Sequence, residues 1–249
     1  MASTDVLVRV QAKGGKFLGP DAGYSRVTLT DVGSGTVLAQ GIAEGGSGTL
    51  SGGFDAGATR QQIVTPQYGT QTTLWLSATP GQPTAGFTAS LELDAHTLVE
   101  FAAEALTDNQ PNGQVVRQTM WLTPGANLTA EPGVVLVMPG LIVQVLAPAT
   151  QTLPGRSLDV SARVTMMCGC QIDPTLPWLP SEFQVTATVS QIGGAFTTTV
   201  PLTFQATSTF DTAAPIALPG PGDYQLAVDA VQAAEGNVGS ASMTFTVDG

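Results

Sequence analysis

Apolar and polar residues alternate with a period of two along most of this chain. In 183–189 (FQVTATV), for example, every second residue is apolar and the residues between are Gln or Thr. Successive side chains of a strand point to opposite faces, so such a run predicts a strand with one packed face and one solvated face. Comparable runs lie at 6–10, 87–93, 160–166, 200–206, 224–230 and 241–247.

Pairs of residues that contain glycine, most of them Gly-Gly or Pro-Gly, separate these runs and predict turns. They include Gly14-Gly15, Pro80-Gly81, Asn112-Gly113, Gly193-Gly194 and Pro219-Gly220. Only 98–106 (LVEFAAEAL) could pass for a helix, but it is short, lacks a cap and fits a strand equally well. The pattern therefore predicts an all-β protein whose antiparallel sheets stack as sandwiches.

The length of 249 residues fits two domains of ordinary size. Two candidate linkers, Thr123-Pro124-Gly125-Ala126-Asn127 and Glu131-Pro132-Gly133, place the break near residue 130, within about ten residues. We expect tandem immunoglobulin-like β-sandwich domains at 1–130 and 131–249.

Two segments resemble known families. Residues 5–50, with the strand SRVTLTD and the stretch GSGTVLAQGIAEGGSG, resemble transthyretin-like or carboxypeptidase-regulatory β-sandwiches, except for extra residues between Lys13 and Tyr24. Residues 218–247 (LPGPGDYQLAVDAVQAAEGNVGSASMTFTV) are similar to the last two strands of bacterial immunoglobulin-like modules, and Tyr224 stands where those folds often carry a corner tyrosine. A cysteine pair of the antibody type is absent from those strands. Both resemblances imply a fold and carry no function.

The charge balance excludes several partners. The net charge is −11, and the only lysines are Lys13 and Lys16, so no basic patch can follow a phosphate backbone or an anionic membrane. No apolar run approaches the roughly 20 residues of a membrane span. No signal peptide is visible, and we expect that a leader was removed and that the protein is extracytoplasmic: periplasmic, secreted or on the cell surface.

Motifs of common enzymes are absent, including the nucleophile elbow, the phosphate loop and the dinucleotide fingerprint. The single histidine, His96, lies between two expected strands with no nucleophile near it in sequence. Glu92 and Asp94 alternate with leucines and so predict a solvated face. We expect no catalytic function.

The most unusual segment is Met166-Met167-Cys168-Gly169-Cys170, which holds both cysteines. If its strand continues, Met166, Cys168 and Cys170 share the core face, Met167 lies on the solvated face, and Cys170 is partly exposed at the rim. Three interpretations stay open: an inert strand end, a disulfide for which Gly169 must bend the chain, and a soft-metal site. The metal would be Cu(I), held by Cys168, Cys170 and Met166 or Met167.

The tryptophans offer one candidate contact. Trp75 and Trp121 fall in strand-like runs and are expected in the core, whereas Trp178 lies in a proline-rich loop and either meets a partner or packs within the loop. We expect a structural or protein-interaction module, such as a subunit of a surface or filament assembly, that binds a protein partner or its own copies. The alternatives are a copper-binding protein and a carbohydrate- or substrate-binding accessory domain that uses Trp178.

Overall fold

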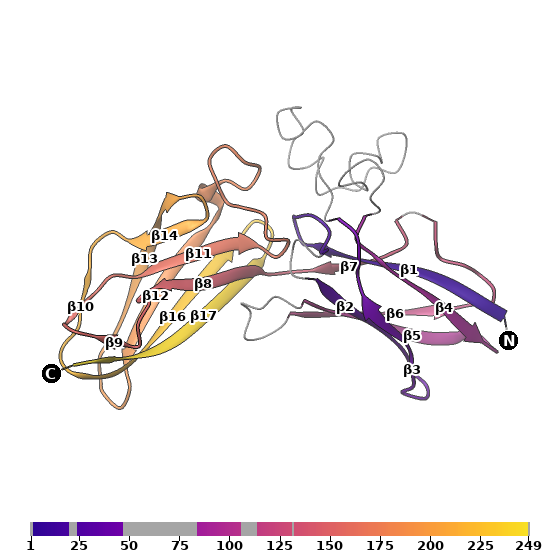
Figure 1. Cartoon of the computed structure of the whole chain (residues 1–249), viewed down its shortest axis with the longest axis horizontal. Coiled ribbons are helices and arrows are strands. Elements are labelled where there is room, and N and C mark those ends of the chain that lie inside the picture. Colours follow the sequence, from indigo (N-terminus) through magenta and orange to yellow (C-terminus); the bar gives the residue numbers. More distant parts are fainter. Residues whose placement is uncertain (1, 20–23, 47–83, 106–113, 131, 249) are drawn as a thin grey trace. The chain divides into compact units, whose positions relative to one another are not determined.

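The computed structural model describes residues 2–19, 24–46, 84–105, 114–130 and 132–248 (Figure 1). Within them every regular element is a β-strand, apart from the short 3-10 helix Pro180–Glu182. The prediction of an all-β protein is therefore confirmed. The ambiguous segment 98–106 forms the strand β5, Thr97–Ala105, with alternate residues buried.

Contacts between Cα atoms divide the chain into two units. The first runs to Pro139 and also takes in Met167–Gly169, and the second holds Gly140–Met166 and the chain from Cys170 onward. The main division, after Pro139, lies within about ten residues of the expected break near residue 130. It follows β7, Val134–Met138, which pairs with β1 of the first unit, whereas the expected bounds had placed this strand in the second domain.

The first unit contains a three-stranded sheet with the order β4-β1-β7 and a four-stranded sheet with the order β3-β2-β5-β6. Their buried faces carry the apolar residues of the alternating runs, including Val6, Val8 and Val10, which are fully buried. The strands not yet given are β1 (Ala2–Ala12), β2 (Ser25–Asp31), β3 (Val37–Ile42), β4 (Phe87–Leu93) and β6 (Val115–Leu122).

The second unit is built on one eight-stranded sheet with the order β8-β11-β14-β13-β12-β16-β17-β9 and a small β10-β15 ladder. Gly239 of β17 comes so close to the Leu141 carbonyl of β8 that a side chain at 239 has no room. The sheet therefore curls round a core that holds Tyr224 and Phe245. The strands are β8 (Leu141–Ala147), β9 (Thr152–Leu153), β10 (Ser157–Leu158), β11 (Ser161–Met166), β12 (Gln184–Gln191), β13 (Thr197–Ala206), β14 (Thr209–Thr212), β15 (Ile216–Ala217), β16 (Gly222–Gln232) and β17 (Asn237–Val247).

Two ladders depart from the expected antiparallel pairing. β1 pairs with β7 in parallel, and β17 pairs with β9 in parallel. In both cases other strands lie between the partners in sequence, which gives the long connection that parallel strands require. The alternation of a single strand does not show this.

The corner tyrosine expected at Tyr224 is present. Its hydroxyl donates a hydrogen bond of 2.8 Å to the carbonyl of Gly220, four residues upstream, and its ring stacks on Phe245 with 5.5 Å between centroids. This is the geometry that ties the corner to the following strand in immunoglobulin-like sandwiches.

Candidate functional site

Both cysteines of the chain are disulfide-bonded, and since there are only two, Cys168 is joined to Cys170. Between them Gly169 has φ +71°, a left-handed conformation that glycine adopts without steric cost. The Met166 amide donates to the Cys170 carbonyl at 3.1 Å, which closes the turn. The expectation that a local disulfide would need Gly169 to bend the chain agrees with this geometry.

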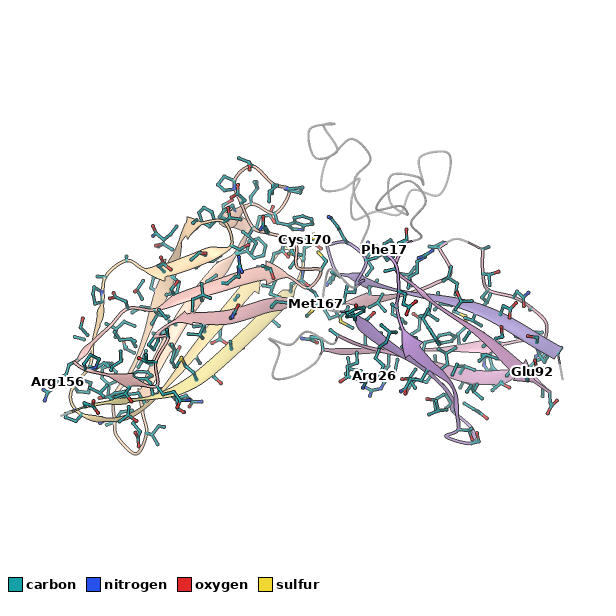
Figure 2. All side chains as sticks on the ribbon, viewed as in Figure 1. Phe17, Arg26, Glu92, Arg156, Met167 and Cys170 are labelled. Carbon is teal, nitrogen blue, oxygen red and sulfur yellow. The ribbon has the colours of Figure 1, made fainter. Side chains whose placement is uncertain are left out.

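The alternation of buried and exposed side chains stops after Met166, where β11 ends and the chain enters a turn. Met167, expected on the solvated face, is fully buried, because side chains of a turn do not follow the alternation of a strand. Cys168 is also buried, while Cys170 is partly exposed, as expected. Figure 2 shows Met167 and Cys170 where β11 ends.

Disulfide-bonded cysteines are not the thiolate ligands that a soft-metal site needs. Cu(I) binds thiolate, and the sulfurs of Cys168 and Cys170 are joined to each other, so a metal would require their reduction. Met166 and Met167 would remain as thioether ligands. In the part of the chain that the structure describes, no three His, Cys, Asp or Glu residues gather as a metal-binding group.

The loop after the disulfide is fastened by Asp173. Its carboxylate accepts hydrogen bonds from the Thr207 hydroxyl at 2.6 Å and from the Thr175 hydroxyl and amide. These bonds, the one from Thr207 first, hold the pKa of Asp173 below its ordinary value. The Asp173 amide in turn donates to the carbonyl of Trp178 at 3.0 Å.

Trp178 is only 1 % exposed, which favours the loop-packing alternative over contact with a partner. Trp121, expected in the core, is instead 67 % exposed, and that expectation was wrong. β6 is the last strand of its sheet, and Trp121 lies on the outer face opposite the part-exposed Leu98 of β5. Trp75 lies outside the described residues.

The titratable residues considered for catalysis lie at the end of β4 and in the turn that follows it, in the first unit. His96 is exposed in the turn between β4 and β5, and Glu92 and Asp94 are exposed, as the alternation predicted. Figure 2 labels Glu92 in β4 of the first unit.

A feature that the sequence analysis missed lies beside β13 in the second unit. β14 pairs with β13 only from Leu202 onward. At Thr212 the chain leaves β13: the Thr212 amide donates to the Val160 carbonyl, and the next strand, β15, pairs with β10. Pro201 has no N–H with which to extend the ladder toward Ala213. A groove of about 440 Å³ opens here, between residues 196–201 and residues 212–217. A proline inside an alternating run was the signal that could have indicated it.

Comparisons with known proteins give no family. No protein-family model and no curated protein matches the chain. Among solved structures, it is similar to "Escherichia coli alpha-2-macroglobulin activated by porcine elastase", with 12 % sequence identity and a TM-score of 0.24, over 99 % of this chain and 22 % of that one. The chain thus spans less than a quarter of that protein, and a TM-score this low supports no functional argument. No helix among the described residues is long and apolar enough to cross a membrane.

Proposed function

We propose that this protein is a non-catalytic, extracytoplasmic module of β-sandwich domains that acts by binding another protein. The observation that carries this proposal is the edge of β13 that faces away from β12: along it no strand of the described residues pairs with 197–201, and it borders an uncharged groove. Open edges are surfaces on which a second chain can add a strand.

The disulfide supports the location. Disulfides form and persist in secreted, periplasmic and surface proteins, and are rare in the reducing cytosol. If the protein is extracytoplasmic, its denatured mass, measured without reductant from the cells that make it, is lighter by two hydrogens than the reduced chain. Free thiols in freshly isolated protein would contradict this part of the proposal.

The binding role is tested by photo-crosslinking in those cells. A photoreactive residue is placed at exposed apolar positions of each unit: Trp121, which is 67 % exposed, and Ile192 and Val238, which are 56 % and 55 % exposed. A discrete adduct with one protein, or with a second copy, supports an interaction module. If every position yields only the monomer, the proposal fails.

A second candidate function is Cu(I) binding by the reduced protein. The disulfide shows that the sulfurs of Cys168 and Cys170 can approach each other, so the reduced pair could chelate one ion with Met166 or Met167. Native mass spectrometry of the reduced protein with one equivalent of Cu(I) should then show a single adduct that Cys168→Ser abolishes. An adduct that persists in this variant would place the ion elsewhere.

A further inference from the structure

We propose that the edge of β13 from Thr197 to Pro201 accepts an extended, uncharged strand of another protein, which lies in the groove between β13 and β15. This inference rests on the proposed function and names its site and the chemistry of its partner.

The direction of the backbone groups follows from the hairpin register. The Gln191 amide donates to the Phe196 carbonyl at 2.9 Å, and Val189 is paired with Thr198 and Ala187 with Val200. Hydrogen-bonded pairs alternate along an antiparallel ladder, so residues 196, 198 and 200 turn their N–H and C=O groups toward β12. Thr197 and Thr199, which stand between them, turn theirs to the other side.

Pro201 agrees with this direction. It is paired with Thr186 within the ladder, yet a proline fits only where a strand has no N–H to give to its neighbour. Its nitrogen therefore faces away from β12, on the same side as the amides of Thr197 and Thr199. On that side the β13–β14 ladder begins only at Leu202. In the described chain, no strand pairs with this outer edge of residues 197–201.

The far wall of the groove is held in place by bonds to other strands. Leu158 of β10 pairs with Ile216, and the Leu218 amide donates to the Arg156 carbonyl at 2.8 Å (Figure 2 labels Arg156 at this end of the unit). Residues 213–217 are thereby kept off β13. The space is formed by the fold and does not depend on a segment that moves aside.

The side chains of the groove select an uncharged occupant. Its walls carry Phe196, Thr198 and Val200 on one side and the sequence TAAPIA of residues 212–217 on the other. No lining residue is charged, in a protein with a net charge of −11. A charged residue in the occupant would lose hydration there and gain no partner, whereas alternating apolar and threonine side chains would match the walls.

These features specify a peptide strand more closely than a small apolar ligand. Two outward amides and their carbonyls, spaced at every second residue, match the repeat of an extended chain. Five residues of edge, 197–201, span roughly 16 Å, enough for a strand of five or six residues.

The probe is a capped synthetic peptide with the sequence of residues 184–191 (QVTATVSQ). It is uncharged and alternating, and the same sequence already pairs with β13 on its other edge as β12. The experiment measures peptide binding by the full chain together with amide hydrogen exchange resolved by residue. We expect saturable binding that slows exchange at Thr197 and Thr199. A peptide with Thr186→Asp and Thr188→Asp, or one with alternate amides N-methylated, should bind at least tenfold more weakly.

Two protein variants separate backbone from side-chain effects. Thr199→Pro removes the outward N–H together with the Thr199–Thr188 hydroxyl contact of 2.9 Å, and Thr199→Val removes only that contact. The proline variant should lose about tenfold in peptide affinity, and the valine variant should bind within about twofold of the parent. The N-methylated peptide gives the same test on the unaltered protein if the proline variant does not fold.

The proposal is overturned if the peptide fails to bind at millimolar concentration, if the N-methylated peptide binds as well, or if slowed exchange lies away from β13. It is also overturned if this edge proves to be the interface of a dimer of the free protein. The crosslinking described above is independent of the peptide: adducts without peptide binding would leave the interaction module standing and reject this site alone.

Discussion

Replacement of Tyr224 by phenylalanine tests whether the corner hydrogen bond stabilises the second unit. The substitution keeps the fully buried ring, its stacking on Phe245 at 5.5 Å and its edge contact with Phe196 at 6.3 Å. It removes one hydroxyl and one hydrogen bond of 2.8 Å to Gly220. The change in stability therefore reports that bond almost alone.

The expected loss is about 1 kcal/mol, the usual net value of an intramolecular hydrogen bond. The bond is only part-buried, so the larger penalty of a fully buried, unpaired acceptor does not apply. For a unit of about 100 residues, this loss lowers Tm by roughly 4 to 6 °C. Tyr224→Leu, which also removes the aromatic contacts, should cost at least 1 kcal/mol more.

The assay is urea unfolding of the full chain, with residue-resolved hydrogen exchange to assign the loss to β16 and β17. Tyr24→Phe is the matched control, because Tyr24 is 45 % exposed and lies in the first unit. Its stability should equal that of the parent. The reasoning is refuted if Tyr224→Phe and Tyr24→Phe are equally stable, or if exchange accelerates in both units alike.

Three further predictions concern the loop and the tryptophans. Trp178→Ala should lower the free energy of unfolding in urea by about 3–5 kcal/mol, because it empties a buried site. Trp121→Ala, at an exposed site, should change it by no more than about 0.5 kcal/mol. Equal losses in the two variants would contradict this reasoning. The folded-state pKa of Asp173 is depressed, so its contribution to stability is full above its ordinary value of 3.8 and is lost as pH falls through the folded pKa. An acid titration should show this loss in the parent and less of it in Thr207→Val, which lacks the largest cause of the shift. Gly169→Ala, at φ +71°, should lower the stability of the oxidised protein by about 1 kcal/mol and leave the reduced protein less affected.

The elements that the sequence predicted well are those fixed by local rules. Every residue of 183–189 with the apolar parity is buried, because a period of two can place only one face toward the core. Tyr224 and Gly169 are similar cases, because each depends on the backbone nearby: Tyr224 bonds to the carbonyl of Gly220, and Gly169 takes the left-handed conformation between the two cysteines.

Pairing between distant strands and the ends of strands were not predictable in this way. The segment VVRQTMWL of β6 has apolar residues at both parities, so its pattern did not show which face Trp121 takes, and pairing with β5 decides it. Met167 was misplaced because alternation continues in the sequence one residue beyond the strand. The parallel partners of β1 and β17 lie far away in sequence, where no local pattern reaches.

Pro201 fits the local pattern of its strand and also contributes to the unpaired edge of β13. In the alternating run 200–206 it merely occupies an outward position, and the ladder to β12 tolerates it because no N–H is needed there. The consequence arises on the opposite side, where the ladder to β14 begins only at Leu202 and the chain after Thr212 pairs with β10 instead. The amides of Thr197 and Thr199 are then left facing a groove that the protein itself does not fill. A residue other than proline at 201 would supply a third outward N–H, while the pairing of β15 with β10 still holds residues 213–217 away from β13, so Pro201→Val should bind the peptide at least as tightly as the parent.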